Sequence, residues 1–206
     1  MKIENFVVGG LGTNCYLLVH DETKEIIIVD PASFSRQMRD YVSENGYVPK
    51  AILLTHAHFD HTMGIDKCVE AYNIPVYLYE EEEELLRNPD LNLSSKFGLG
   101  YSYDGALGLA DNKEVELAGM RFQVIHTPGH TKGSCCYYFA DDGVLISGDT
   151  LFAQSVGRTD FPTGSMSQLV RSIRERLMIL PEKVEVYPGH GETTTIGFEK
   201  EHNPFI

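Results

Sequence analysis

Cysteine is scarce in this chain of 206 residues, which contains only four and pairs none of them in a CxxC motif. The two adjacent ones, Cys135 and Cys136, fall in a predicted strand, where neighbouring side chains face opposite ways. We interpret all four, which include Cys15 and Cys68, as reduced thiols that pack as small buried residues. This usage excludes a disulfide framework and is typical of a cytoplasmic protein.

The chain also lacks long apolar runs and is poor in basic residues. No stretch approaches the roughly 20 apolar residues that span a membrane, and the opening MKIENFVVGG lacks the pattern of a secretory signal. Seventeen Lys and Arg residues against 30 Asp and Glu residues give a net charge of −13. Phosphate backbones repel such a surface. We therefore expect a cytoplasmic protein and neither a nucleic acid nor a membrane as partner, which leaves a small molecule among the expected partners.

The remaining composition is that of a globular protein, with 42% hydrophobic and 23% charged residues. Because no low-complexity linker divides the chain, we expect a single domain over residues 1–206. Apolar runs predict strands over residues 3–8, 15–19, 25–29, 51–54, 75–79, 114–117, 121–125, 134–139, 144–147 and 184–187, the first three as an antiparallel meander. Helical spacing predicts helices over residues 33–45, 62–72, 80–87 and 165–180, with a short one in the tail, 193–206.

Two segments carry no regular apolar pattern. Residues 88–110 are polar and glycine-rich, which is consistent either with a loop over a site or with a plain surface excursion. The five consecutive glutamates of residues 80–84 are interpreted as a solvated helix face without a role.

The sequence THAHFDH, residues 55–61, is the most informative stretch. It follows a short buried strand and places three histidines and an aspartate within six positions. Alternate side chains of an extended backbone share a face, so His56, His58 and Asp60 can point the same way, while His61 turns off that line. Solvent loops have no reason to concentrate ligands at this spacing, so we predict a metal site here.

Three later strand ends each carry one further ligand type. Pro-Gly turns present His130 and His190, and Gly148 lets the backbone come close to whatever Asp149 holds. His126, just upstream of the first of these turns, is expected to pack or hydrogen-bond instead. Each residue alone is weak evidence, but the four strand ends together predict one site.

The number of ligands suits two divalent metal ions. Imidazole and carboxylate without sulfur favour zinc, with iron or manganese as alternatives. Asp149 has two oxygens and can bridge ions about 3.5–4 Å apart, with a water completing each coordination sphere. The predicted ligands are His56, His58 and His130 for one ion, and Asp60, His61 and His190 for the other, with Asp149 between them.

The motifs THAHFDH, TPGHTKGS, LISGDTLF and YPGHGE, in this order, resemble those of the metallo-β-lactamase-fold hydrolases. The resemblance covers nearly the whole chain. It implies an α/β fold, a four-layer αβ/βα sandwich of two mixed β-sheets flanked by helices, with the metals at one edge.

Within that superfamily the chain is most similar to the glyoxalase II branch, the hydroxyacylglutathione hydrolases, and to its short single-domain bacterial members. Asp149, the segment GRTDFP and the ending HNPF carry this likeness. True β-lactamases usually place cysteine or histidine among the second-half ligands and are exported, so we do not expect antibiotic hydrolysis. The chain departs from full-length glyoxalase II by ending soon after His190 and by carrying Arg158 and Asp160 where that enzyme has a lysine and a tyrosine.

The resemblance implies a metal-bridging hydroxide that attacks a thioester such as S-lactoylglutathione. Asp60 would orient the nucleophile and take its proton. Arg158 is either an anchor for an anionic substrate tail or a structural partner of Asp160. The alternatives are an iron-dependent persulfide dioxygenase, whose single iron is held by the equivalents of His56, His130 and Asp149, a hydrolase of another ester or lactone, and a non-catalytic metal-binding sensor.

Overall fold

The computed structural model describes residues 1–206 and contains two six-stranded sheets. The first sheet has the strand order β1-β2-β3-β4-β5-β6, and the second has the order β14-β13-β10-β9-β8-β7. The strands of the first sheet are β1 (Lys2–Val8), β2 (Thr13–Val19), β3 (Glu25–Val29), β4 (Val48–Leu53), β5 (Val76–Tyr79) and β6 (Leu107–Leu109). Those of the second are β7 (Glu114–Leu117), β8 (Met120–His126), β9 (Cys135–Phe139), β10 (Val144–Gly148), β13 (Glu185–Pro188) and β14 (Thr194–Thr195). A separate small hairpin joins β11 (Leu151–Phe152) to β12 (Ser155–Val156).

Both sheets are mixed, as expected for the predicted sandwich. In the first, β1 to β3 form the predicted antiparallel meander, and β3 to β6 are parallel. In the second, β7 to β10 are antiparallel, and β13 lies parallel to β10.

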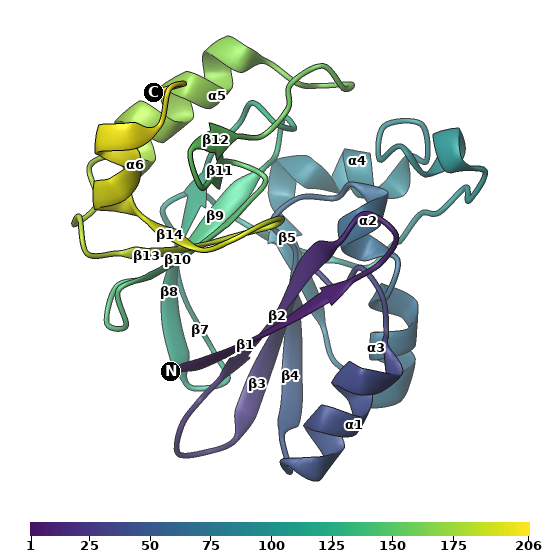
Figure 1. The fold of residues 1–206 in the computed structure, drawn as a ribbon. Helices are drawn as coiled ribbons and strands as arrows, with labels where there is room; N and C mark the ends of the chain where they lie inside the picture. The colour runs from purple at the N-terminus through teal and green to yellow at the C-terminus, as the bar shows by residue number, and fades with distance from the viewer.

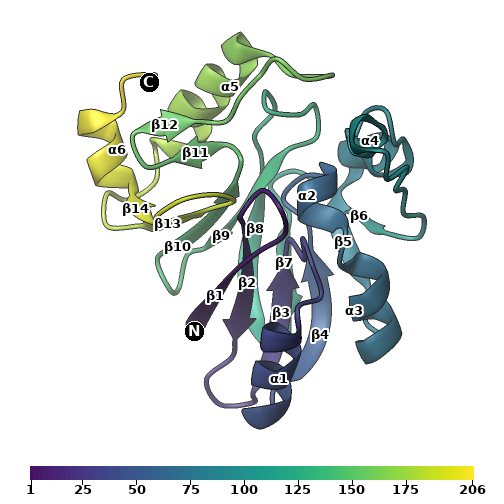
Figure 2. The same ribbon diagram turned by 45° about the vertical axis from the view of Figure 1, so that its right-hand side comes forward.

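Alternation along the strands builds the layers. In β2, Leu17 and Val19 belong to a core beneath α1 (Arg36–Glu44) and α3 (Ile65–Tyr72), while Tyr16 and Leu18 belong to the core between the sheets. A third core joins the outer face of the second sheet to α5 (Met166–Ser172) and α6 (Ile196–His202). Figures 1 and 2 show α1 and α3 on one side of the molecule and α5 and α6 on the other. The predicted four-layer α/β fold is confirmed.

The helices begin and end close to the predicted positions, with informative differences. The helix predicted from residue 33 begins at Arg36, because the Ser35 hydroxyl accepts a hydrogen bond from the Met38 amide at 3.1 Å and caps it. The helix predicted over 62–72 begins only at Ile65 as α3, and Gly64 separates it from a preceding short helix, α2 (Phe59–Thr62). A Cβ at Gly64 would lie 2.5 Å from the Pro31 carbonyl oxygen, so the chain passes too closely there for a side chain.

The prediction that the five glutamates of residues 80–84 form a solvated helix face is wrong for one of them. It forms a 3-10 turn, Glu80–Glu82, followed by α4 (Glu83–Arg87), and Glu82 is buried rather than solvated. The 88–110 segment contains a 3-10 turn, Ser94–Phe97, before β6, and α5 continues into a π-helical turn, Ile173–Leu177. No helix is both long and apolar enough to cross a membrane. All four cysteines are free and buried, as expected.

Candidate metal centre

The predicted ligands follow strands that run in the same direction within each sheet. The segment 55–61 follows β4 in the first sheet, while His130, Asp149 and His190 come after β8, β10 and β13 in the second. Because the carboxyl ends of parallel strands meet at one edge of a sheet, this topology gathers the side chains at one edge of the sandwich. The structure brings all seven predicted ligands into one cluster.

The first group is a corner of three histidines, all at most 2% exposed. The Nδ1 atom of His58 lies 3.0 Å from Nε2 of His130, which lies 3.2 Å from Nε2 of His56. Ligand nitrogens around a tetrahedral zinc ion, at metal–nitrogen distances of about 2.0–2.1 Å, are themselves roughly 3.3 Å apart. The spacing of the three nitrogens therefore fits a single metal ion.

The second group combines two imidazoles and a carboxylate. The Nε2 atoms of His61 and His190 are 3.3 Å apart, and Oδ2 of Asp60 lies 3.3 Å from Nε2 of His190. The three ligand atoms converge as those of the first group do. This group also fits one cation.

Asp149 lies between the two groups. Its Oδ2 is 3.5 Å from Nε2 of His130, and its Oδ1 is 3.5 Å from Nε2 of His61. The Oδ1 atom is buried and has no hydrogen-bond partner, which is costly for a carboxylate oxygen unless a cation neutralises it. Oδ2 also lies 3.7 Å from Nε2 of His190. The carboxylate therefore contacts both groups, as a bridging ligand requires.

Hydrogen bonds at the outer nitrogens orient the rings. Nδ1 of His130 donates to the carbonyl of Arg158 at 2.7 Å, and Nδ1 of His190 donates to that of Gly12 at 3.3 Å. A neutral imidazole that donates through Nδ1 carries its lone pair on Nε2. In both rings, Nε2 is the atom that faces the cluster, so the tautomer needed for metal binding is already selected.

Asp30 is a supporting residue that the sequence analysis did not single out, although it directly follows the predicted strand over residues 25–29. Its Oδ1 accepts a hydrogen bond from the Thr55 amide at 2.8 Å, and its Oδ2 accepts from the Thr55 hydroxyl at 2.6 Å and from Nδ1 of His61 at 2.9 Å. Asp30 is 1% exposed. The available signal was a carboxylate directly after a buried strand, the same signal that identified Asp149.

The pKa shifts of the clustered histidines run in opposite directions. Burial, together with the neighbouring histidines, lowers the pKa of His56 and of His58, so both rings are neutral. Burial also disfavours the charged form of His61, but the carboxylates of Asp149 and Asp60 outweigh it and raise the pKa of His61 to about 10. The acidic half of the cluster thus attracts positive charge, and a bound cation would take the place of that proton.

The donor set is one of imidazole and carboxylate without sulfur, which suits zinc, iron or manganese. A closed structural zinc site keeps four protein ligands on one ion, whereas here two groups of three ligands share Asp149 as their only common ligand. The arrangement is therefore compatible with a catalytic binuclear centre.

A pocket of about 450 Å³ lies beside the cluster and is lined by five of the proposed ligands. Arg158 also lines it, and its guanidinium makes two 2.8 Å bonds to Asp160, the structural pairing considered from the sequence. His126 is outside the cluster, as expected: its ring stacks on Tyr79 at 4.2 Å, and its Nε2 bonds to the Lys132 carbonyl.

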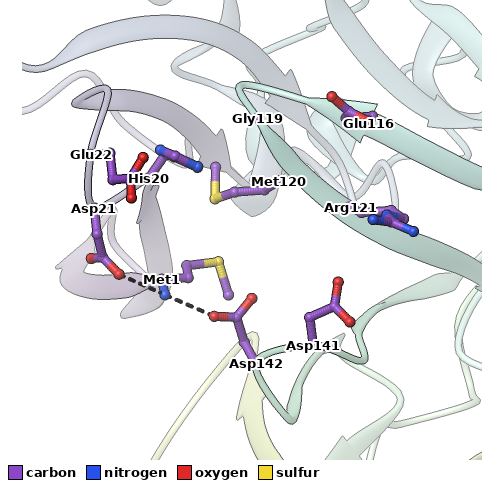
Figure 3. A pocket seen from close by; sticks show the side chains of 10 residues that line it. All are labelled: Met1, His20, Asp21, Glu22, Glu116, Gly119, Met120, Arg121, Asp141 and Asp142. Atoms are coloured by element: carbon purple, nitrogen blue, oxygen red, sulfur yellow. Dashed lines mark hydrogen bonds and ion pairs between the residues drawn. The ribbon is translucent and has the colours of Figure 1, made fainter.

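A second hollow, of about 460 Å³, lies at the opposite ends of the strands, where β2, β8 and β10 meet their turns (Figure 3). Its lining is largely acidic, and the N-terminal ammonium pairs with Asp21 at 3.0 Å and Asp142 at 2.8 Å. None of the clustered ligands reaches it, so the chemistry lies at the other edge.

Residues 8–190 match the sequence profile of the Metallo-beta-lactamase superfamily, and the chain therefore belongs to this superfamily of metal-dependent, hydrolase-like enzymes. Among its relatives, the probable metallo-hydrolase YqgX of Bacillus subtilis is 38% identical over 208 residues, covering 100% of this chain and 98% of that protein. The hydroxyacylglutathione hydrolase GloC of Haemophilus influenzae is 32% identical over 210 residues, with coverages of 100% and 98%.

Solved structures that resemble this chain agree with the family assignment. The BLEG-1 B3 metallo-beta-lactamase superposes with a TM-score of 0.93 at 40% identity, covering 99% of each chain. TTHA1623 in a di-iron-bound form has a TM-score of 0.88 at 36% identity, covering 98% of this chain and 100% of that one. ETHE1 from Myxococcus xanthus has a TM-score of 0.81 at 28% identity, with coverages of 99% and 84%.

Proposed function

We propose that this protein is a binuclear metal-dependent hydrolase that cleaves thioesters, with S-lactoylglutathione as the first substrate to test. The observation that carries the proposal is the position of Asp149 between two three-ligand groups beside an open pocket. The likeness to GloC supports a thioester, because that relative is a hydroxyacylglutathione hydrolase.

Two divalent ions held by His56, His58 and His130, and by Asp60, His61 and His190, would supply water activation and carbonyl polarisation. The protein's own groups provide the rest. Asp60 is 14% exposed at the pocket, where its carboxylate can orient a water and take its proton. Arg158, 58% exposed at the pocket rim, is our proposed contact for an anionic tail of the thiol carrier.

An iron-dependent persulfide dioxygenase is the second candidate. It is favoured by the likeness to ETHE1 from Myxococcus xanthus. The likeness to TTHA1623 in a di-iron-bound form makes iron an ion that the experiment must include. The likeness to BLEG-1 adds a β-lactam to the compounds that an assay must include.

The deciding experiment compares activities after metal-free protein is reconstituted separately with zinc, iron and manganese. Elemental analysis accompanies hydrolysis of S-lactoylglutathione and of a cephalosporin, and oxygen uptake with glutathione persulfide. We expect two ions per chain and thioester hydrolysis that Asp149→Ala and His58→Ala each abolish. Full activity in either variant contradicts the two-metal scheme, and oxygen uptake with one iron per chain selects the dioxygenase.

A further inference from the structure

Glu82 is a buried carboxylate outside the ligand set. It lies in the 3-10 turn after β5 and is 1% exposed, although Glu80, Glu81 and Glu84 beside it are exposed. Burial raises the pKa of Glu82 to about 7, against the opposing effect of its hydrogen-bond donors. A carboxylate is costly to bury, so its hydrogen bonds are informative.

The Glu82 carboxylate bonds to both loops that form the three-histidine corner. Its Oε1 accepts from the Ala57 amide at 3.0 Å and from the Thr131 hydroxyl at 2.8 Å. Its Oε2 accepts from the Gly133 amide at 2.9 Å. Ala57 lies between two ligands, and Thr131 directly follows His130.

These two loops belong to different sheets, since the first follows β4 and the second follows β8. Their relative position sets the 3.0 Å separation of His58 and His130. Gly133 allows the close approach: a Cβ there would lie 2.6 Å from Oε2 of Glu82 and 2.5 Å from its backbone nitrogen.

We propose that Glu82 is a positioning residue that holds His58 and His130 at ligand spacing by bonding to both loops at once. It acts through the Ala57 and Gly133 amides and does not bind the metal itself. Without Glu82 the two loops can move apart, which separates His58 from His130 and weakens metal binding.

Glu82→Gln tests this, because either orientation of the new amide sets its NH2 group against a backbone N–H, of Ala57 or of Gly133. We expect a 10- to 100-fold loss of zinc affinity by chelator competition at a temperature where circular dichroism shows the variant folded. We also expect a changed visible spectrum with cobalt(II). If Glu82→Gln does not fold, Thr131→Val removes one donor and should weaken zinc binding by about threefold to tenfold.

Glu199→Gln is the matched control. Glu199 is also fully buried and accepts from the Gln154 amide at 2.9 Å, the Thr194 hydroxyl at 2.6 Å and the Asn203 amide group at 2.7 Å, none of them in the two loops. It should lower the melting temperature and leave zinc affinity unchanged. Wild-type affinity in Glu82→Gln or in folded Thr131→Val, or an equal loss in Glu199→Gln, overturns the proposal.

The wall of the active pocket supports a second inference, which rests on the proposed thioester hydrolysis. Beyond the ligands, its polar residues are Ser155 and Arg158, and the rest of the wall is apolar, including Phe59, Phe97 and Phe161. Phe97 is 57% exposed and lies against Phe59, with ring centroids 4.5 Å apart and planes tilted by 32°. The rings of Phe161 and His58 meet edge to face, with centroids 5.7 Å apart. An exposed aromatic ring at the mouth of a pocket has apolar area left to bury.

We infer that the acyl group of the substrate is apolar, unlike the hydroxylated lactoyl group. The Arg158 guanidinium, which is assigned to the carrier, lies 3.8 Å from the centroid of the Phe161 ring, so Phe59 and Phe97 remain for the acyl side. A small hydroxylated acyl group would leave this wall uncovered and would find few side-chain partners for its hydroxyl.

The test holds the thiol carrier fixed and compares phenylacetyl, hexanoyl and lactoyl thioesters. We expect kcat/KM at least tenfold higher for the two apolar esters, and a roughly tenfold loss of that preference in Phe97→Ala. The control is Phe198→Ala, a 41% exposed ring on α6 outside the pocket. Calorimetry with a non-hydrolysable S-phenethyl thioether should show binding weakened by Phe97→Ala alone.

Different results would overturn the inference about the acyl group and the proposed thioester hydrolysis. A preference for the lactoyl ester, or unchanged selectivity in Phe97→Ala, overturns the inference about the acyl group and leaves thioester hydrolysis standing. No cleavage of any of the three esters with any of the metals overturns the proposed function, and the inference about the acyl group with it.

Discussion

A single methyl group at Gly189 should disable the centre without unfolding the protein. Gly189 follows β13 and has no positive φ that would exclude alanine, so the effect is steric. A Cβ there would lie 2.2 Å from Oδ1 of Asp149 and 2.8 Å from Cε1 of His61. The backbone cannot retreat easily, because the Gly189 amide donates to the Gly148 carbonyl and its carbonyl accepts from the Asn14 amide, both at 2.8 Å.

The magnitude follows from these distances. Carbon and oxygen atoms in contact lie at least about 3.2 Å apart, so the Asp149 carboxylate must move by about 1 Å. A misplacement of this size costs about 10²-fold in rate. Overpacking costs roughly 1–3 kcal/mol of folding free energy, which most domains survive.

The assay compares Gly189→Ala with Gly10→Ala, whose added Cβ meets nothing within 4 Å. Zinc affinity from chelator competition and thioester turnover are measured on both, together with the free energy of unfolding in urea. We expect Gly189→Ala to lose about 10²-fold in turnover and at least tenfold in zinc affinity, and Gly10→Ala to behave as wild type. Wild-type affinity and turnover in Gly189→Ala would refute the reasoning that Asp149 must occupy its present position.

Three further predictions concern the same cluster. Asp30→Asn replaces an acceptor of hydrogen bonds from Thr55 and His61 with a mixed donor and acceptor, and should weaken zinc binding by about 10- to 100-fold in chelator competition. Removing metal with EDTA should lower the free energy of unfolding by roughly 4 kcal/mol relative to protein with free metal at 1,000 times its dissociation constant; an unchanged urea midpoint would contradict metal binding to the folded state. In metal-free protein the raised pKa of His61, about 10 against an ordinary 6.5, contributes stability that is complete below pH 6.5 and is lost as the pH rises towards 10. Urea unfolding in EDTA should show a loss of roughly 1–3 kcal/mol over that window, and His61→Asn should abolish this slope.

Much of the architecture was predictable from local pattern. Strands such as Glu25–Val29 and Val144–Gly148 are apolar runs bounded by turn residues, and their period and length determine their type. Helix ends were less predictable. The division at Gly64 depends on how closely residue 31 of the preceding segment approaches, and this is a contact between segments distant in sequence.

The seven predicted ligands are short-range signals, since each lies in the segment that follows an apolar strand. Their supporting residues are not. Asp30 directly follows a buried strand, as Asp149 does, but nothing local indicates that it supports a ligand instead of binding the metal, and Glu82 lies in a run of glutamates that resembles solvated surface. Their roles come from hydrogen bonds to Thr55, Ala57 and Gly133, whose sequence separations of 25 residues or more no local pattern encodes.

Contiguous segments of the sequence are enough to predict the strands, the helices and the chemical types of the ligands, because hydrophobic periodicity and strand-end residues are local properties. The four-layer fold was implied by the resemblance of the motifs to the metallo-β-lactamase-fold hydrolases. Only the packed structure shows which nitrogen of each histidine faces the centre, that Asp149 lies between two groups, and that one buried glutamate joins loops of both sheets. Those properties depend on distances between segments that only the packing of the two sheets brings together.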